Sequence, residues 1–223
     1  MSDPGEIADQ TRFADFEREL GARLRQPLPG ADAQRRFAPV PVRPGWAPDL
    51  PAADARRAAA LLLVYPRGNG PTLVLTIRHA GLPHHPGQIS LPGGAIDPGE
   101  STEAAALREA HEEIGVTPDE VRIVGVLSPL WIPVSNFDVT PVVGVADVRP
   151  AFRPHPGEVS GLIELSLHDL RDVTRVGWDQ RQRRDHMVDY PFIAVDGHRI
   201  WGATAMILSE FCCLFDPDYG AGR

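Results

Sequence analysis

The stretch of the chain with the most chemical potential is a Gly/Pro-rich loop that runs into a helical segment crowded with carboxylates, residues 93–116. Glu109, Glu112 and Glu113 have the i, i+3, i+4 spacing of neighbours on one helix face. Carboxylates this close repel one another, and Mg²⁺ is a hard cation that prefers oxygen ligands. A solvated acidic helix face would show the same spacing. The segment therefore predicts either a divalent-metal site or a solvated face.

The two ends of this helix are marked in the sequence. Ser101 or Thr102 is expected as the N-cap, and Gly115 as the residue that ends the helix. At about 100° per residue, the glutamates share one side of the helix with two alanines, so we expect nothing bulky to cover them. The opposite side is expected to face a core. The alanines beside the glutamates are Ala105 and Ala106, and the core-facing residues are Leu107, Ala110 and Ile114.

Taken whole, the segment resembles the Nudix box, G-x5-E-x7-R-E-U-x-E-E-x-G-U, in which U is aliphatic. The residues that fill this pattern are Gly94, Glu100, Arg108, Glu109, Ala110, Glu112, Glu113, Gly115 and Val116. The resemblance implies a hydrolase that cleaves a diphosphate linked to another group, usually in a nucleotide derivative, with Mg²⁺ or Mn²⁺. It also implies an α/β (α+β) fold, an α/β/α sandwich with a mixed sheet.

The resemblance assigns roles to the residues of the box. Glu109 and Glu113 are implied as metal ligands, Glu112 as the next ligand, and the carbonyl of Gly94 as a further oxygen donor. Arg108 is expected to orient a glutamate, through Glu100, because bidentate hydrogen bonding suits a guanidinium. Glu100 and Gly115 are then structural parts of the box.

The general base stays open at this stage. A glutamate of the box is one option. Glu158, in the segment HPGEVSG, is another, because a carboxylate on a loop could reach a metal-bound water. A solvated loop residue is an equally good reading of Glu158.

A second motif lies upstream, where residues 74–94 resemble the signature of the coenzyme A (CoA) pyrophosphatase branch, L-L-T-x-R-S-x3-R-x3-G-x3-F-P-G-G. The matching residues are Leu75, Thr76, Arg78, Gly87, Pro92, Gly93 and Gly94. The departures are His79 for Ser, Pro83 for Arg and Leu91 for Phe. Arg78 is the first choice for a substrate phosphate contact. The replacement of the motif's second arginine by Pro83 removes another candidate phosphate contact.

Other residues could contact substrate on their chemistry alone. Trp131 and Phe137 could stack on adenine, although apolar residues at strand ends are more often core. The loop residues His84 and His85 could touch a 3′-phosphate or be solvated. Trp201 is expected in the core.

Length and composition are those of one globular domain with an N-terminal extension. The 223 residues carry a net charge of −8, which disfavours a nucleic-acid polymer as partner. Every basic residue is arginine, which excludes a Schiff-base lysine and a Walker-A lysine. No apolar run has membrane-spanning length and no secretory signal opens the chain, so we expect a cytoplasmic protein. The adjacent Cys212 and Cys213 are expected as core filler.

We divide the chain into residues 1–53, a helix over 1–25 followed by a Pro-rich extended segment, and residues 54–223, the hydrolase domain. Phe37 and Trp46 would anchor the extended segment if it packs. The elements expected in the domain are strands over 55–66, 72–78, 121–131, 137–148, 184–195 and 198–202, a strand or short helix over 158–167, a helical turn over 168–173 and a final helix over 203–215.

Three functions remain compatible with these patterns. The first is hydrolysis of CoA or acyl-CoA to 3′,5′-ADP and (acyl-)4′-phosphopantetheine, with a small-molecule nucleotide as the partner. The second is the same reaction on ADP-ribose, a dinucleotide or an oxidised nucleotide. The third is a non-catalytic Nudix binding module, which would usually have lost box carboxylates. The N-terminal residues could equally mediate homodimer formation.

Overall fold

The computed structural model describes residues 4–68, 70–82, 87–183 and 186–221, with the backbone alone for residues 4–10, 183 and 186. Its centre is a mixed eight-stranded sheet in which β3-β2-β1-β7-β5 are neighbours, with β4 on β1, β6 on β7 and β8 on β2. These strands are β1 (Arg56–Arg67), β2 (Gly70–Arg78), β3 (Ile89–Ser90), β4 (Gly93–Ala95), β5 (Arg122–Val126), β6 (Leu130–Ile132), β7 (Phe137–Val145) and β8 (Val159–Ser166).

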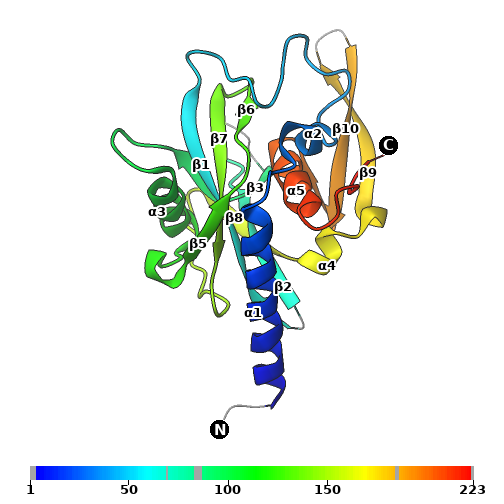
Figure 1. Cartoon of the computed structure of the whole chain (residues 1–223). Helices are drawn as coiled ribbons and strands as arrows, with labels where there is room; N and C mark the ends of the chain where they lie inside the picture. The colour runs from blue at the N-terminus through cyan, green and yellow to red at the C-terminus, as the bar shows by residue number, and fades with distance from the viewer. Residues whose placement is uncertain (1–3, 69, 83–86, 184–185, 222–223) are drawn as a thin grey trace.

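Helices cover both faces of this sheet (Figure 1). The helices are α1 (Pro4–Leu24), α2 (Gly30–Arg35), α3 (Thr102–Ile114), α4 (Leu167–Leu170) and α5 (Ala203–Cys213), with single 3₁₀ turns at Pro118–Glu120 and Val173–Arg175. In β1, Leu61 and Leu63 pack under α3, and Leu62 and Val64 pack on the opposite side with α1 and α5. A strand buried on both faces reads as one continuous apolar run. The predicted α/β/α sandwich with a mixed sheet is confirmed.

The N-terminal helix predicted over residues 1–25 is present as α1. Phe13 and Leu20 are buried in the core, and the ring of Phe16 stacks on Phe215 at 5.7 Å between centroids. Its first turns project beyond the rest of the molecule (Figure 1). The amphipathic spacing of α1 is therefore satisfied by packing against the sheet and the end of α5.

The prediction that residues 26–54 are extended throughout was wrong, because they contain α2. Glu210, fully buried on α5, accepts hydrogen bonds from the backbone N–H of Gly30 at 3.2 Å and from Gln34 at 2.8 Å. The same carboxylate accepts from the N–H of Ser128 at 3.1 Å. One buried carboxyl group with three donors thus holds the N-terminal segment to α5 and to the loop before β6. A division of the chain at residue 53 stays a prediction.

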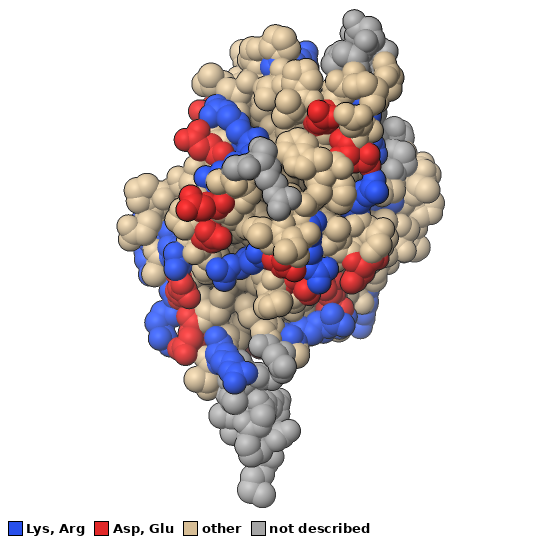
Figure 2. Space-filling model, turned by 90° about the vertical axis from the view of Figure 1, so that its right-hand side faces the viewer, with Lys and Arg blue, Asp and Glu red and all other residues tan. Residues whose placement is uncertain are grey.

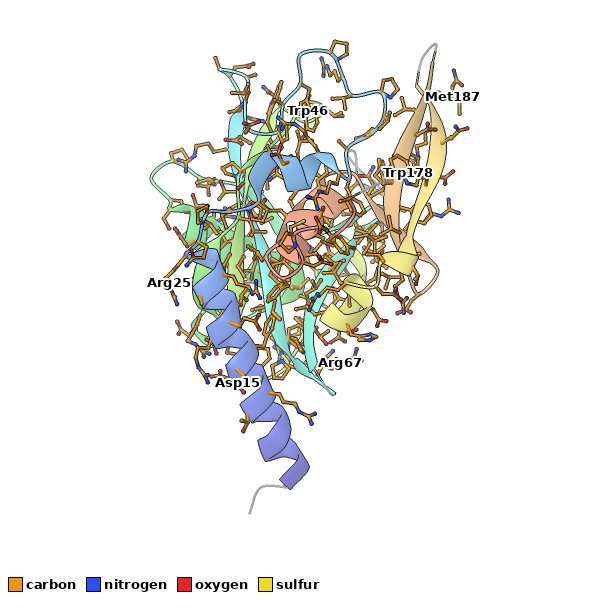
Figure 3. All side chains as sticks on the ribbon, turned by 45° about the vertical axis from the view of Figure 1, so that its right-hand side comes forward. Asp15, Arg25, Trp46, Arg67, Trp178 and Met187 are labelled. Carbon is orange, nitrogen blue, oxygen red and sulfur yellow. The ribbon has the colours of Figure 1, made fainter. Side chains whose placement is uncertain are left out.

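Further along the Pro-rich segment, Val40 forms a bridge to Asp189 of the strand that spans residues 186–195, and the part around Trp46 (Figure 3) lies against β6. Trp46 donates its indole N–H to the carbonyl of Trp131 at 3.0 Å, and the N–H of Trp131 donates to the carbonyl of Pro48 at 2.8 Å. Phe37 is buried. The expected anchoring by Phe37 and Trp46 is therefore confirmed.

A second sheet of three strands, β11-β10-β9, lies beyond α5 (Figure 1). Its strands are β9 (Val176–Arg183), β10 (His186–Val195) and β11 (His198–Trp201). The polar sequence of β9 hid it from prediction. Ile193, Val195 and Ile200 face the core on α5, and Figure 3 shows Trp178 and Met187 on the outer hairpin.

Trp201 is not a core residue, contrary to expectation. It pairs with Phe192 in the register of β10 and β11, on the face turned away from Ile193 and Ile200, and is partly exposed. Cys212 and Cys213 are buried free thiols, as expected. The remaining boundary differences are smaller: the strand predicted over 121–131 is split into β5 and β6, and residues 158–167 contain the strand β8.

No helix in the described ranges combines the length and apolarity needed to cross a membrane. Acidic and basic side chains are interleaved over the face shown in Figure 2. This mixed surface differs from the one-sign basic stripe that nucleic-acid-binding proteins present.

Candidate active site

The box helix α3 begins and ends where its sequence predicts. Ser101 is the N-cap, and its side-chain oxygen accepts the N–H of Ala104 at 3.1 Å. Gly115 ends the helix with φ +72°, a left-handed conformation that favours glycine. A Cβ at Gly115 would also meet the side chain of Arg153 at 2.8 Å. These two ends fix the length of the helix and the register of its glutamates.

The predicted orientation of α3 was partly wrong. Ala105 and Ala106 are completely buried, whereas Leu107 is only partly so. Glu113, expected on an open side, is 4% exposed and turned toward the sheet. Because alanine side chains are small, the helix lies close to β1 and β4 and carries Glu113 inward. The three glutamates therefore lie at the edge of the contact between α3 and the sheet, where Glu113 is buried and Glu112 is exposed to solvent.

Gly93 and Gly94 make this close approach possible. In β4 they pair with Ala60 and Ala59 of β1. A Cβ at Gly93 would lie 2.4 Å from the backbone oxygen of Ala59, and a Cβ at Gly94 would lie 2.5 Å from the carboxyl of Glu109. A Cβ at Gly93 would therefore meet fixed backbone and one at Gly94 would displace the carboxyl of Glu109, so glycine at both positions lets the box carboxylates reach the backbone of β4.

Glu113 and Arg78 meet beside Gly93. The carboxylate of Glu113 accepts the N–H of Gly93 at 3.3 Å and lies 3.8 Å from the guanidinium of Arg78. Burial raises the pKa of Glu113 to about 7, against the favourable charge of Arg78. The Nε of Arg78 is buried and finds no hydrogen-bond partner within the described part of the chain. Arg78 thus keeps an unused donor next to the glutamates.

Arg108 ties the loop of the box to its helix. Its Nε and Nη2 donate to the two oxygens of Glu100 at 2.9 and 3.0 Å, and its Nη1 donates to Glu109 at 2.8 Å. Its Nη2 also donates to the carbonyl of Ala95 at 3.0 Å, and its Nη1 lies 3.4 Å from Glu112. These contacts lower the pKa of Glu100, while burial raises the pKa of Glu109. The geometry is that of a residue that orients glutamates.

Glu158 lies directly before β8, and its carbonyl accepts the N–H of His79 at 2.7 Å. Its negative charge contributes to the raised pKa of both Glu109 and Glu113. A loop carboxylate from far along the chain is therefore brought to the box glutamates, as required for the Glu158 alternative.

The structure does not bring Trp131 and Phe137 to this group of residues. Trp131 pairs with Asp138, so its side chain and that of Phe137 alternate to opposite faces of the sheet. Phe137 lies under the guanidinium of Arg56 at 4.0 Å. In the sheet, β1 and β7 separate β6 from β4, which places Trp131 about 14 Å from Gly94 across three strand spacings. The loop residues His84 and His85 fall outside the described residues.

Sequence reasoning missed Arg57 at the start of β1. It donates to the side-chain oxygen of Thr102 at 3.2 Å and so holds the first turn of α3. The alternation of side chains along β1 could have predicted this position, because it puts Arg57 on the same face as Ala59 and Leu61, under that helix.

The donor set fits a divalent cation in its chemistry. Two glutamates whose charged forms are disfavoured by burial and by each other would be stabilised by a hard cation, and Glu112 and the carbonyl of Gly94 could add oxygens. Within the described ranges, no three His, Cys, Asp or Glu side chains already converge into a ligand shell. Glu109 and Glu112 would have to turn from Arg108 toward the ion.

Comparison with known proteins identifies this arrangement. Residues 55–194 match the NUDIX domain family. The chain belongs to the Nudix family. Two similar relatives are each called "Uncharacterized Nudix hydrolase NudL". That of Enterobacter sp. (strain 638) is 39% identical over 156 residues, 70% of this chain and 81% of the relative. That of Citrobacter koseri is 40% identical over 166 residues, again 70% and 81% of the two chains.

A MutT protein from Methanosarcina mazei Go1, among solved structures, is similar at a TM-score of 0.48 and 17% identity, over 72% of this chain and 96% of that one. As a Nudix hydrolase, the present protein acts on the pyrophosphate bond of a nucleoside diphosphate derivative. Its Nudix box is the loop and helix from β4 through α3, where the carboxylates meet Gly93, Gly94 and Arg78.

Proposed function

We propose that this Nudix hydrolase cleaves the diphosphate of CoA or acyl-CoA, giving 3′,5′-ADP and (acyl-)4′-phosphopantetheine, with Mg²⁺ or Mn²⁺. The observation that carries the proposal is Arg78. It is the arginine of the upstream motif, it lies 3.8 Å from Glu113, and its buried Nε has no partner among the described residues. A buried donor without a partner is costly, so a phosphate oxygen of the substrate would stabilise it.

Two departures from the branch motif fit their surroundings. His79 accepts the N–H of Gly81 through Nδ1 at 3.0 Å, a local turn contact that a serine hydroxyl could also make. Leu91 is buried in the core, where an aromatic residue would have the same packing role. Pro83, the third departure, lies outside the described residues. The missing second arginine favours the alternative substrate class, another nucleoside diphosphate derivative without a 3′-phosphate.

In the proposed mechanism, divalent cations, when bound, would supply charge neutralisation at the diphosphate and a lower pKa for a bound water. Glu109, Glu112 and Glu113 would hold them, with the carbonyl of Gly94. Arg108 donates to Glu109 while its other donors bind Glu100 and Ala95, so Glu109 is held beside the loop of the box until it turns to an ion.

The remaining steps fall to residues around the glutamates. Arg78 binds a phosphate oxygen, and Gly93 keeps Glu113 facing the same place through its N–H. Glu158 accepts the proton of the attacking water as the oxygen bonds to phosphorus and the anhydride P–O bond breaks. A box glutamate is the alternative acceptor of that proton, and the two alternatives differ in which substitution abolishes the acidic limb of the pH–rate profile, where the base becomes protonated.

The test is hydrolysis of CoA, dephospho-CoA, ADP-ribose and NADH with Mg²⁺ or Mn²⁺, with products separated chromatographically. Glu112→Gln is the inactivating variant. Glu120→Gln, an exposed glutamate in the 3₁₀ turn that follows α3, is the matched control. Preferential release of 3′,5′-ADP from CoA, lost in Glu112→Gln alone, supports the proposal. Faster turnover of another substrate would support the alternative, a hydrolase of another nucleoside diphosphate derivative. No turnover with either ion would favour a binding module.

A further inference from the structure

Residues 152–158, which we call the strap, pass over the end of the box helix on their way from β7 to β8. The N–H of Arg153 donates to the carbonyl of Ile114 at 2.7 Å, and the N–H of His155 donates to the carbonyl of Glu113 at 2.8 Å. Both acceptors lie in the last turn of α3, where backbone carbonyls have no partner within their own helix. The strap therefore docks on the turn of α3 that carries a box glutamate.

The strap is also held at both of its ends. The ring of Phe152 packs against the core on the α3 side of the sheet and meets the ring of Tyr65 edge-on, with 5.5 Å between the centroids. At the other end, the carbonyl of Glu158 accepts the N–H of His79, the residue that follows Arg78. The strap thus joins the box helix to the end of the strand that carries the candidate phosphate-binding arginine.

Two prolines stiffen the strap between these contacts. Proline fixes its own φ and restricts the backbone of the residue before it, and the strap contains Pro154 and Pro156. The N–H of Glu158 donates to the carbonyl of His155 at 3.0 Å and closes the turn that follows. A movement of Arg153 is therefore passed on to Glu158, because little backbone freedom lies between them.

Gly115 leaves the space in which the strap docks. A Cβ at Gly115 would lie 2.8 Å from the Cβ of Arg153 and 3.2 Å from its backbone nitrogen and oxygen. Non-bonded carbon atoms pack at about 3.5–4.0 Å, so a side chain at this position would push the strap away from α3. The left-handed φ of +72° does not by itself require glycine, because asparagine also adopts it. Contact with the strap is thus a second and separate reason for glycine at the end of the box.

We propose that Gly115 and the strap are positioning elements of the active site. By admitting the strap to the end of α3, Gly115 sets the place of Glu158 relative to Glu109 and Glu113. The negative charge of Glu158 contributes to the raised pKa of both of these glutamates, so the three groups interact. The proposal rests on the role of Glu158 as proton acceptor proposed above and deepens it, because it names what holds that carboxylate beside the box. It applies to any diphosphate substrate, since no part of it depends on a 3′-phosphate.

A double-mutant cycle between Gly115→Asn and Glu158→Gln tests the proposal, with the diphosphate substrate that the chain hydrolyses fastest. We expect Gly115→Asn to lower kcat at least about tenfold with KM changed less than about twofold, because a displaced base affects the chemical step and not substrate binding. The same substitution in the Glu158→Gln background should lower the remaining kcat less than about twofold, because the carboxylate that it misplaces is already gone.

Gly197→Asn is the matched control, because Gly197 also has a left-handed φ, +79°, and a Cβ there would meet none of the described atoms within 4 Å. It should keep kcat within about twofold of the parent chain. Equal losses from Gly115→Asn in both backgrounds would overturn the proposal, since Gly115 would then act through α3 alone. Undiminished kcat in Glu158→Gln would overturn it as well, together with the role of Glu158.

Hydrogen–deuterium exchange separates this proposal from the proposed reaction, because it needs neither metal nor turnover. We expect Gly115→Asn to speed amide exchange in the strap at least about tenfold and to leave exchange in the middle of α3 unchanged. If this pattern holds while CoA is not hydrolysed, the proposed reaction fails and the docking of the strap through Gly115 stands. Unchanged exchange in the strap, or equally faster exchange along the whole of α3, would overturn the positioning role whatever the substrate.

Discussion

A methyl group added at either glycine of β4 should have opposite consequences for stability and activity. In Gly94→Ala, the new Cβ would lie 2.5 Å from the carboxyl of Glu109, the end of a flexible side chain. In Gly93→Ala, it would lie 2.4 Å from the carbonyl oxygen of Ala59 and 2.6 Å from the Cα of Ala60, which are backbone atoms. A side-chain end can turn away at little cost, whereas a paired strand cannot.

For Gly93→Ala we expect the cost of an overpacked site, about 2 kcal/mol. In a chain of this size, that lowers the melting temperature by about 4–8 °C. For Gly94→Ala we expect a melting temperature within about 2 °C of the parent, because only Glu109 moves. If Glu109 holds the metal as proposed, its displacement by about 1 Å should nevertheless lower kcat about 100-fold.

Thermal melts followed by circular dichroism and turnover assays at saturating metal measure both effects. Gly70→Ala is the control, since a Cβ there meets nothing within 4 Å. Full activity in Gly94→Ala would show that the position of Glu109 against β4 does not matter for the reaction. Equal destabilisation by both substitutions would show that the helix–strand contact, and not the carboxylate, meets the added methyl at Gly94.

Three further predictions concern single side chains. Because the pKa of Glu113 is raised to about 7, the metal-free folded chain binds more protons than the unfolded chain between about pH 4.5 and 7. Its stability should therefore fall as pH rises through that window, by at most about 3 kcal/mol, and urea titrations of Glu113→Gln should show a flatter dependence. Arg108→Lys should lower kcat about tenfold or more with little change in KM, because one ammonium cannot hold Glu100 and Glu109 together; unchanged kinetics would contradict its orienting role. Glu210→Ala should destabilise the fold by about 3 kcal/mol in chemical denaturation, because it leaves buried N–H groups unpaired, whereas a loss below about 1 kcal/mol would mean that Gln34 and its neighbours find other partners.

The Nudix box could be predicted in detail because its signals are local. Ser101 caps the helix through the N–H of Ala104 and Gly115 ends it, both within a few residues of the positions they control. The spacing of the glutamates followed from helical geometry. The direction in which the glutamates point did not follow from the sequence, because Ala105 and Ala106 are compatible both with an exposed side and with a close contact between helix and sheet.

The missed elements depend on partners far along the chain. Helix α2 has six residues, and its buried Gln34 is held by Glu210. Strand β9 has a polar sequence that shows no strand alternation, and it is a strand because β10 provides its hydrogen bonds. Trp201 was expected in the core because its ring is apolar. Side chains alternate between the two faces of β11, so the face that Trp201 occupies depends on the register of the sheet, which the sequence alone does not show.

The contact between α2 and Glu210 also determines when the N-terminal segment can dock on the rest of the fold during translation. Gln34 and Glu210 are 176 residues apart, so at about 5–20 residues per second the ribosome needs roughly 10–35 seconds between them. Throughout that interval Ala33 and Phe37 have no α5 to bury them. A nascent chain that stops before residue 203 would leave its N-terminal segment undocked, open to chaperones and proteases, however well the box itself had formed.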